Sequence, residues 1–457
     1  MPDQANVLNS DASGRLERLS FTAAHGRAVA TVGAGHFFDG FDALSISFVV
    51  PVLIAAWHLS PGQVGLLISV GYLGQFVGAF SLGRLAEQFG RMRTFRATLV
   101  IISIFSLACA FSTSFAMLAT LRFLQGIGLG AEIPVGGTYI NELCPARLRG
   151  RIVFVLQCMF SLAVFVTAAV SSAIIPALGW QSVFIIGSLP ILIVPLTLAF
   201  APESPRWLAS QGRHAEAEAA LSVFEQSAAR SGENLAPVAA AAPAAARQAT
   251  RIADLWAPHL RARTLSSWVI CFCLAFFGFG LLTWMPTLFR TVYHLPLGQA
   301  LRLAASQNIV SLLAAVIGFF LIDTLGRRRI FLYAFLGASV PMIVLAFTAS
   351  GLPPTTVRTL SAVTMFFASL MNISVFLYVG EVYPTHLRAT GAGAASAWFR
   401  MGAILSPIAT AALLAHGSIG AVFGCFAFAA LVGAVTVFLF MVETRGRRLE
   451  EITDQHS

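Results

Sequence analysis

Three ionisable side chains, His36, Asp39 and Asp42, interrupt an apolar stretch between Ala28 and Trp57. A carboxylate facing lipid at the middle of a bilayer costs about 2.5–3.5 kcal/mol on insertion scales, so two of them need a compensating environment. A spacing of three residues places all three side chains along one face of a helix. We expect this face to line a polar cavity in which Asp39 and Asp42 exchange protons. His36 is expected to serve helix packing. The alternative, a buried helix of a soluble protein with paired acids, is disfavoured because the rest of the chain is equally apolar.

Arg122 and Glu132 are two further ionisable residues within an apolar segment. Counting 1.5 Å per residue from the ends of the expected helices leaves a gap of roughly 12 Å in depth between Asp42 and Arg122, most of which an arginine side chain can cover, so an ion pair between them is expected. The same count places Glu132 level with Asp39 and Asp42. We therefore predict a proton-coupling set of Asp39, Asp42, Arg122 and Glu132. The alternative for Asp42 and Arg122 is a permanent structural ion pair.

Arg400 lies near the middle of an apolar segment with no obvious acidic partner. Such a cation is costly unless a counter-ion arrives with a ligand, and a guanidinium can bind a carboxylate through two hydrogen bonds. We predict that Arg400 binds a substrate carboxylate; the alternative is a structural role with bonds to backbone carbonyls. The other predicted members of the substrate pocket are polar or amphipathic: Gln157, Trp284, Gln307, Asn308, Asn372 and Trp398. Each of these alone is better explained by helix packing.

The composition requires a membrane. The chain of 457 residues is 57% hydrophobic and 11% charged, with a mean hydropathy of +0.80. Apolar runs long enough to cross a hydrocarbon core of about 30 Å recur throughout, whereas the alternating segments of a β-barrel are absent. We predict an all-α polytopic membrane protein. Its twelve expected helices are 28–57, 63–86, 94–112, 115–141, 152–176, 180–200, 265–291, 299–323, 328–350, 356–382, 387–414 and 418–442.

The positive charges indicate the orientation. All 29 cations are arginine, and they cluster at 84–96, 147–151, 206–263, 327–329 and 445–448, in segments that fall on one side of the membrane. This is the positive-inside pattern, so both termini are expected in the cytoplasm, with the chain in the cytoplasmic (inner) membrane. The same distribution argues against nucleic-acid binding despite the net charge of +9. The N-terminal 26 residues lack the pattern of a cleaved signal peptide.

The chain divides into two similar halves. We expect an N-terminal tail (1–27), a six-helix bundle (28–200), a central loop (201–264), a second six-helix bundle (265–442) and a C-terminal tail (443–457). Three acidic motifs recur 236, 239 and 240 residues apart; they begin at Glu87 and Asp323, at Glu142 and Glu381, and at Glu203 and Glu443. A repeated six-helix half is the architecture of transporters that rock two bundles about a central site.

The recurring motifs resemble those of the major facilitator superfamily. Residues 83–93, GRLAEQFGRMR, are similar to the signature G-x-x-x-D-R-x-G-R-R/K, with Glu87 in place of the aspartate and Gln88 and Met92 in place of basic residues. Residues 122–134, RFLQGIGLGAEIP, resemble the helix-4 pattern R-x-x-x-G-x-G-x-x-x-E-x-P. PESPRWL (202–208) and VETRGRRLEE (442–451) resemble motifs that close each half in sugar-porter-like members. The resemblance covers essentially the whole chain.

Two subgroups of that superfamily are similar in more detail. The sequence DGFD (39–42) resembles the D-G-x-D of aromatic acid:proton symporters, whereas residues 130–150 and 381–407 look more like nicotinate-type and synaptic-vesicle-2-like members. The resemblance implies a transporter and not an enzyme: a monomeric, proton-coupled symporter of a small aromatic or pyridine carboxylate, with the proton as coupling ion and no cofactor. A sugar porter and a non-transporting nutrient receptor are the alternatives. No P-loop motif for ATP is present.

Charged residues at the helix ends on the arginine-rich side form a predicted cytoplasmic gate. Opposite charges there are expected to pair, to hold the inner side shut in the outward-open state, and to separate when that side opens. The alternative is a solvated set that only fixes the topology. The gate residues are Glu87, Arg91, Glu142, Arg149, Glu203, Asp323, Arg327, Glu381, Arg388 and Glu443. Cys271 and Cys273, with no histidine nearby, do not indicate a metal site.

Overall fold

The computed structural model describes residues 12–232, 251–384 and 387–444, apart from the side chains of 315, 319–320, 322–324, 373 and 389. Within these ranges the regular structure is entirely helical. The twelve membrane-spanning segments expected from the sequence are present, and each boundary lies within six residues of its predicted position. The predicted fold class is confirmed.

The first half contains six spans. Five are single helices: α2 (Ala23–Trp57), α3 (Pro61–Phe89), α4 (Arg91–Ala110), α5 (Phe115–Leu143) and α6 (Ala146–Leu178). The sixth was predicted as one helix over 180–200 and is instead built from α7 (Gln181–Gly187), the 3-10 turn η1 (Leu189–Leu192) and α8 (Ile193–Phe200). Pro190 lies in that turn, where its missing N–H interrupts the α-helical hydrogen-bond pattern.

The second half repeats this arrangement after a connecting segment. The connecting segment forms α9 (Pro205–Ser210), α10 (His214–Arg230) and the 3-10 turn η2 (Ile252–Trp256). The six spans that follow are α11 (Arg261–Thr291), α12 (Leu297–Leu325), α13 (Arg327–Thr348), α14 (Pro354–Val382), α15 (Arg388–Ala415) and α16 (Ile419–Phe440).

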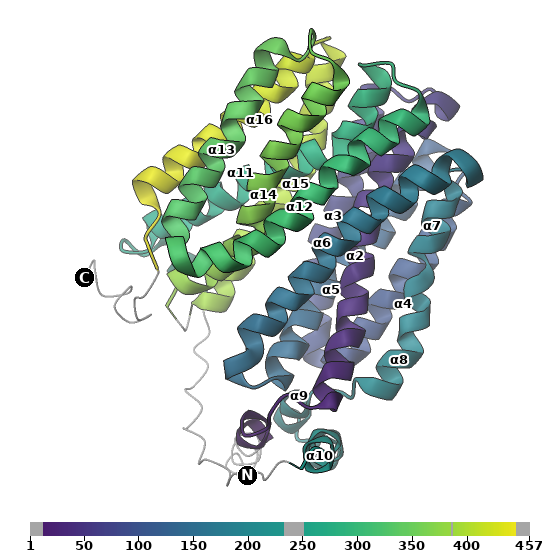
Figure 1. Cartoon of the computed structure of the whole chain (residues 1–457). Helices are drawn as coiled ribbons and strands as arrows, with labels where there is room; N and C mark the ends of the chain where they lie inside the picture. Colours follow the sequence, from purple (N-terminus) through teal and green to yellow (C-terminus); the bar gives the residue numbers. More distant parts are fainter. Residues whose placement is uncertain (1–11, 233–250, 385–386, 445–457) are drawn as a thin grey trace.

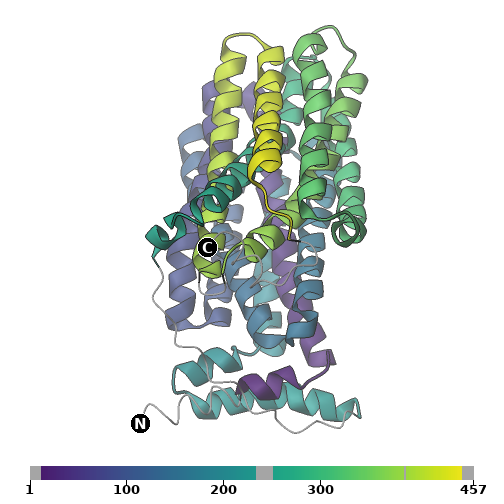
Figure 2. The same ribbon diagram turned by 90° about the vertical axis from the view of Figure 1, so that its left-hand side faces the viewer.

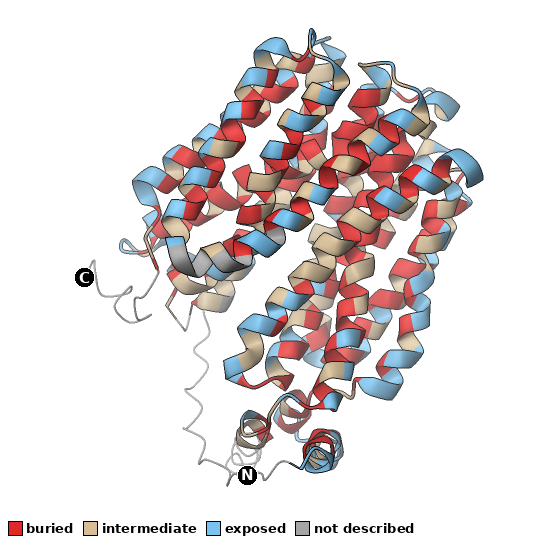
Figure 3. Cartoon of the chain, viewed as in Figure 1, coloured by how far each residue is buried: buried red, intermediate tan, exposed pale blue. Residues whose placement is uncertain are grey.

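The helices present apolar side chains outward as well as inward. Eleven segments of the described chain are long and apolar enough to cross a membrane. The twelfth span, α5, is 29 residues long and carries Arg122 and Glu132 in its interior. Large apolar residues on the outer faces are exposed, among them Phe347 (85%) and Leu178 (71%), while buried residues gather between the helices (Figure 3). The chain is therefore a membrane-spanning protein.

Equivalent helices pair in the two halves. In the first half α2 packs on α6 and α3 on α5; in the second, α11 packs on α15 and α12 on α14. The contact between α3 and α5 is particularly close. A Cβ atom at Gly78 would lie 1.9 Å from the main-chain oxygen of Ile127, and one at Gly130 would lie 2.0 Å from that of Gln75. The absence of a side chain at these glycines lets α5, with its ionisable residues, pack closely against α3.

The bundle has two ends, which we name by their chemistry. The basic side is the end where α2 begins and α3 meets α4, and the far side is the opposite end.

The halves contact each other along α3 and α15, along α6 and α12, and along α2 and α11. Toward the far side this contact is tight: a Cβ at Gly65 would lie 2.7 Å from the Cβ of Ala411, and Ser69 donates a 2.6 Å hydrogen bond to the main-chain oxygen of Ile404. Toward the basic side the helices of the two halves diverge (Figure 1).

A layer of short helices lies across the basic end of the first half (Figure 2). It consists of α9, α10 and a short helix at residues 12–17. Arg15 forms ion pairs of 2.7 Å with both Glu218 and Glu225 of α10. Glu17 accepts a 2.7 Å hydrogen bond from the main-chain N–H of Ala146 at the start of α6. The segment before α2 is thereby joined to both α10 and α6.

Candidate functional site

Asp42 and Arg122 form a buried ion pair that joins α2 to α5. Nη1 of Arg122 lies 2.9 Å from Oδ2 of Asp42, so the pair expected from the sequence is present. Gln125 completes the arrangement: its Nε2 donates to Oδ1 of Asp42 at 2.8 Å, and its Oε1 accepts from Arg122 at 2.7 Å. All three residues are at most 2% exposed. Because both oxygens of Asp42 have partners, the carboxylate is compensated in this conformation.

The surroundings of Arg122 fix its position. Nη2 would lie 3.2 Å from a Cβ at Gly71, so the absence of a side chain there makes room for the guanidinium. The ring of Phe184 lies 6.0 Å from its central carbon, at cation–π distance. Gln125 was missed in the sequence analysis, although it follows Arg122 by three residues and therefore shares its helix face.

His36 and Glu132 form a second buried pair between the same two helices. Nδ1 of His36 lies 3.0 Å from Oε2 of Glu132 and 3.2 Å from Oε1. A Cβ at Gly35 would lie 2.8 Å from Oε1 of Glu132, so this glycine permits the approach. His36 was assigned only to helix packing from the sequence. Its spacing of three from Asp39 was the signal for a further role.

Asp39 lies between these two pairs along α2 and has the fewest partners. Its side chain is 3% exposed, and Oδ1 makes no hydrogen bond within the described part of the chain. It interacts electrostatically with Glu132, His36, Asp42 and, from the second half, Arg400. A buried carboxylate oxygen without a donor is unfavourable, and protonation or the approach of a cation relieves that cost.

Arg400 reaches from the second half to the first. Its Nη1 donates to the hydroxyl of Ser396 at 2.9 Å, and its Nη2 donates to the main-chain oxygen of Gly130 at 3.3 Å. Both acceptors are neutral, and no described carboxylate lies within ion-pair distance of the guanidinium. The side chain is partly exposed. The contact with Gly130 matches the backbone-bonded alternative for Arg400, and the same geometry leaves its charge available to an anion.

A cavity of about 60 Å³ lies between the halves. A water needs about 10–15 Å³ by this measure, so the cavity can hold a few waters. Its lining comes from α6, α11, α12 and α14: Gln157, Phe160, Ser161, Val164, Leu274, Gly278, Phe279, Leu282, Ser311, Met365, Ala368, Ser369 and Asn372. Gln157 and Asn372 are thus the predicted pocket residues that line it. The ring of Phe399, which precedes Arg400 in α15, packs edge-on against the lining residue Phe279 at 5.7 Å, whereas Arg400 itself is not part of the lining.

The other predicted pocket residues lie outside this lining. Trp398 faces an apolar groove between α11, α15 and α16 and stacks on Trp268 at 5.5 Å. It is two residues from Arg400, so the helical period directs the two side chains to different faces of α15. Trp284 is 1% exposed and packs in the core toward the far end of α11. Gln307 and Asn308 are buried in α12, each with a side-chain oxygen that has no hydrogen-bond partner among the described residues.

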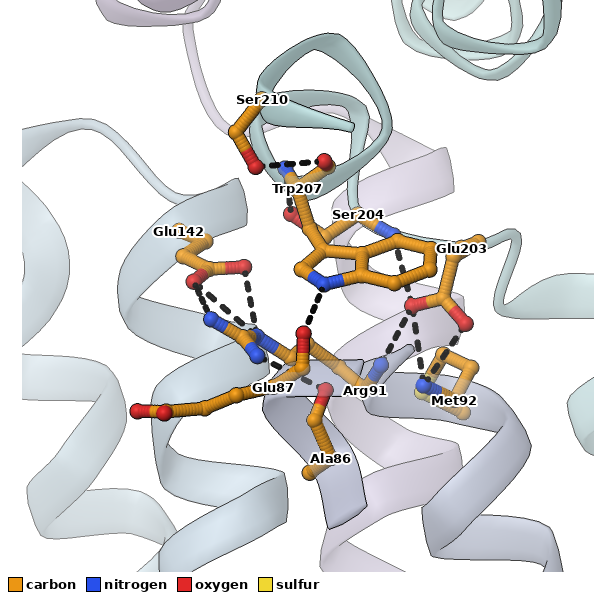
Figure 4. Close-up of polar contacts among 9 residues, drawn as sticks. All are labelled: Ala86, Glu87, Arg91, Met92, Glu142, Glu203, Ser204, Trp207 and Ser210. Carbon is orange, nitrogen blue, oxygen red and sulfur yellow. Dashed lines mark hydrogen bonds and ion pairs between the residues drawn. The ribbon is translucent and has the colours of Figure 1, made fainter. Parts of the chain in front are cut away.

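Three of the predicted gate residues, Arg91, Glu142 and Glu203, form a compact cluster at the basic end of the first half (Figure 4). Arg91 at the start of α4 lies 3.0 Å from Glu142 near the end of α5. Glu203 accepts hydrogen bonds from the main-chain N–H groups of Arg91 and Met92, at 2.8 and 2.9 Å. Trp207 of α9 adds a 2.8 Å bond from its indole N–H to the main-chain oxygen of Glu87. A carboxylate at a helix N-terminus is favoured by the free N–H groups there.

The second half repeats this cluster with its own residues. Arg327 at the start of α13 lies 3.1 Å from Glu381, and its main-chain N–H donates to Glu443 at 2.9 Å. The sequence repeat is therefore also a repeat of contacts. In both clusters the ion pair joins helices of a single half, and both pairs are intact in this conformation, so the predicted gating role stays a prediction.

The remaining gate residues have separate positions. Glu87 is exposed, and its side chain makes no ion pair within the described part of the chain. Arg149 pairs with Glu17 and donates to the main-chain oxygen of Cys144 at 3.0 Å. Arg388 begins α15, and the side chain of Asp323 lies outside the described residues. In the part of the chain that the structure describes, no group of three or more His, Cys, Asp or Glu side chains is placed to hold a metal ion.

Comparison with known proteins gives one consistent family. Residues 28–455 match the family model described as "Sugar (and other) transporter". The niacin transporter NiaP of Acinetobacter baylyi is 32% identical over 447 residues, covering 97% of this chain and 99% of the relative. The 4-hydroxybenzoate transporter PcaK of the same species is 28% identical, covering 88% of each chain.

A solved structure supports the fold independently. The xylose transporter XylE of Escherichia coli, in a partially occluded inward-open conformation, superposes with a TM-score of 0.73 at 18% identity, over 93% of this chain and all of that one. Together with the family match, this confirms the resemblance drawn from the sequence motifs. The chain belongs to the sugar (and other) transporter family of the major facilitator superfamily, and it is a membrane-spanning transporter and not an enzyme.

Proposed function

We propose that this transporter is a proton-coupled symporter of small aromatic or pyridine carboxylates. The substrate binds between the two halves, and a rocking motion exposes it to one side of the membrane at a time. The proton is the coupling ion, no other cofactor takes part, and one chain suffices for transport. Relatives named for niacin and 4-hydroxybenzoate, both aromatic acids, support this substrate class.

The observation that carries the proposal is the position of Arg400. Its guanidinium lies where the halves meet, partly exposed, with only a hydroxyl and a main-chain oxygen as hydrogen-bond acceptors among the described residues. Neither acceptor compensates its charge. A substrate carboxylate would provide two charge-assisted hydrogen bonds and the missing negative charge. The aromatic ring of the substrate would then lie toward the mostly apolar cavity next to Phe279.

The buried carboxylates of the first half supply the proton-binding groups. Asp42 has Arg122 and Gln125 as partners, and Asp39 has an oxygen without a donor. When the cavity is hydrated from one side or the other, the charged and protonated forms of these groups are stabilised differently. That difference is what a symporter requires to link proton movement to a conformational change.

The orientation follows from the distribution of arginine. With the basic side in the cytoplasm, the chain obeys the positive-inside rule and lies in the cytoplasmic membrane with both termini inside. The far side, where Gly65 and Ser69 pack against α15, is then the outer side. In this orientation the conformation described is closed to the outside.

Two rival functions remain testable. A sugar porter is favoured by the name of the family and by the fold of XylE, although that structure is only 18% identical. A non-transporting nutrient receptor would bind a ligand without moving it. The sugar-porter alternative assigns Arg400 to packing and gives no reason for a cation where the two halves meet.

Competition between ligands tests the substrate class. Purified protein in liposomes takes up labelled nicotinate, and unlabelled nicotinate, nicotinamide and xylose are added as competitors. The proposal predicts strong competition by the acid, weak competition by the amide because it carries no charge for Arg400, and none by the sugar. Uptake of labelled xylose that nicotinate does not inhibit would establish a sugar porter, and binding without uptake would establish a receptor.

A further inference from the structure

The groove between α11, α15 and α16, which Trp398 lines, is separate from the cavity between the halves. Its volume is about 440 Å³, and its lining is apolar and largely aromatic. It opens on the outer surface of the bundle, because its lining residues Leu265, Trp398 and Phe428 are 53, 41 and 68% exposed. The chain spans the membrane, so this opening faces lipid.

The groove has about the length of one leaflet of the bilayer. α11 is the seventh span and begins on the basic side, and the residues of this helix that line the groove run from Leu265 to Phe276. At 1.5 Å per residue they rise about 16 Å, which is about half of a hydrocarbon core of about 30 Å. An acyl chain from the leaflet on the basic side therefore fits along the groove.

The end of the groove on the basic side carries groups that suit a phospholipid headgroup. Arg261 lies one turn before Leu265, so it shares the face of α11 that lines the groove. It is exposed and forms no ion pair within the described residues. Trp256 of η2 is 48% exposed and packs edge-on against Trp268 at 5.3 Å. Tryptophan at a membrane–water boundary and arginine beside an anionic lipid surface are both favourable.

Trp268 also has an unused hydrogen-bond donor. Its ring lies between those of Trp256 and Trp398, at 5.3 and 5.5 Å, and its Nε1 is buried without an acceptor among the described residues. A buried indole N–H usually has a partner. The ester carbonyls of a phospholipid lie between its headgroup and its chains, so a lipid in the groove would supply acceptors near Trp268.

The corresponding corner of the first half is filled by the protein itself. Motifs of the two halves recur 236–240 residues apart, so the start of α2 corresponds to the start of α11. There Arg27 lies over the ring of Phe200 at the end of α8, at 5.6 Å, and Phe224 of α10 packs on His25 at 4.8 Å. Among the described residues of the second half, no such helix covers the groove.

We propose that this groove binds one anionic phospholipid from the leaflet on the basic side. The phosphate pairs with the guanidinium of Arg261, the ester region lies beside Trp268, and one acyl chain follows the groove toward Phe276. A zwitterionic phospholipid offers the same chains, but the cation of its headgroup already compensates the phosphate. Arg261 therefore favours an anionic headgroup.

The bound lipid would contact a helix that also forms a wall of the cavity between the halves. Phe272 and Phe276 of α11 line the groove, whereas Leu274 and Gly278 of the same helix line the cavity. The lipid thus packs against the outer face of α11 at the depth where its inner face lines the cavity.

Photocrosslinking in bilayers tests the proposal. The full-length chain is reconstituted in phosphatidylcholine vesicles that contain the same small fraction of one of two probes, a phosphatidylglycerol or a phosphatidylcholine with one diazirine-bearing acyl chain. After irradiation, labelled residues are located by peptide mass spectrometry. We expect the phosphatidylglycerol probe to label the groove faces of α11 and α16 about fivefold more than the phosphatidylcholine probe, the effect of one arginine near an anionic group.

Four variants separate the headgroup from the chain. Arg261→Gln should make labelling by the two probes equal, whereas Arg84→Gln, which removes an exposed arginine at the basic end of α3, should preserve the difference. Ala429→Phe fills the groove and should abolish labelling of its lining by both probes. Leu431→Phe, on an exposed face of α16 outside the lining, should not.

Three results would overturn the proposal. They are equal labelling by both probes in the wild type, a preserved difference in Arg261→Gln, and labelling of the groove that persists in Ala429→Phe. Absence of labelling from α11 and α16 in the wild type would show that something other than lipid covers the groove, and would overturn the proposal as well. Because Arg261 is an exposed residue, Arg261→Gln gives a decisive result even if Ala429→Phe does not fold.

Discussion

The guanidinium of Arg400, on α15 of the second half, donates a hydrogen bond to the main-chain oxygen of Gly130, on α5 of the first half, at 3.3 Å. Two residues beyond Gly130, Glu132 is paired with His36. One contact between the halves therefore lies beside the buried acids of α2 and α5. This proximity is the structural basis for assigning substrate binding and proton binding to adjacent groups.

Substitution of Arg400 should weaken nicotinate binding, and alanine should weaken it more than lysine does. Lysine retains the charge but loses the planar pair of donors, so Arg400→Lys should bind nicotinate about tenfold more weakly than the wild type. Arg400→Ala loses the charge as well and should bind nicotinate about a hundredfold more weakly. Equilibrium binding to purified protein gives both values. The exposed Arg302 of α12 supplies the control, since Arg302→Ala removes the same charge from the same half. Equal affinity in Arg400→Ala and Arg302→Ala would assign Arg400 to packing.

Substitutions in the ion pair between Asp42 and Arg122 should show separately how the pair affects the stability of the protein and how it affects proton-coupled accumulation. Arg122→Leu leaves the Asp42 carboxylate buried without its cation and should lower the free energy of unfolding by about 3–5 kcal/mol. The double variant Asp42→Leu/Arg122→Leu removes both charges and should recover most of that loss, measured as thermal stability in detergent. The recovered protein should still fail to accumulate substrate. Full pH-driven accumulation by the double variant would mean that the pair is only structural.

A larger residue at Gly65 should open the far side. A Cβ there would already lie 2.7 Å from Ala411 and 2.8 Å from the main-chain oxygen of Pro407, so Gly65→Leu cannot pack as described. We expect a cysteine introduced at Asn372 in the cavity to become more accessible to a charged thiol reagent from the far side. Gly62→Leu, at the start of the same helix, is the control, because its nearest neighbour is 4.0 Å away. Unchanged labelling in Gly65→Leu would show that α3 and α15 do not control access.

The segment before α2 should leave α10 in acid. Hydrogen bonds from Arg15 lower the pKa of Glu218 and are the largest cause of the lowered pKa of Glu225. A carboxylate whose pKa is lowered by folding contributes stability above its unfolded pKa, and this contribution is lost as the pH falls through the folded value. Spin labels at Ser13→Cys and Ser222→Cys should therefore stay close at neutral pH and separate below about pH 4. Arg15→Ala should separate them already at neutral pH, whereas Arg230→Ala, at the end of α10, should not.

Much of the architecture was predictable because membrane helices leave strong local signals. Apolar length defined the spans, and the repeated acidic motifs defined the halves. Depth along two antiparallel helices, together with the length of an arginine side chain, was enough to propose the pairing of Asp42 with Arg122 across a gap of roughly 12 Å. The break of the sixth span at Pro190 was missed because its apolar pattern continues through the turn.

The site was harder to predict because the sequence indicates how deep a residue lies in the membrane but not toward which neighbouring helix its side chain points. Trp398 and Arg400 lie at nearly the same depth, yet they point to different faces of α15, and only the packing of α11 and α16 decides which face meets the cavity. The partner of Glu132 depended on Gly35, which lets the two helices approach closely. The docking of Arg15 and Glu17 depends on contacts with residues more than a hundred positions away, for which the sequence contains no local pattern.

Accumulation of nicotinate against its gradient tests the central claim most directly. Liposomes containing the wild-type protein are given an inside-alkaline pH gradient, and internal labelled nicotinate is followed with time. The account predicts accumulation above the level that the pH gradient alone produces in protein-free liposomes, its loss when a protonophore is added, and its absence in Asp42→Asn. Simple equilibration by the wild type, or full accumulation by both Asp39→Asn and Asp42→Asn, would contradict it.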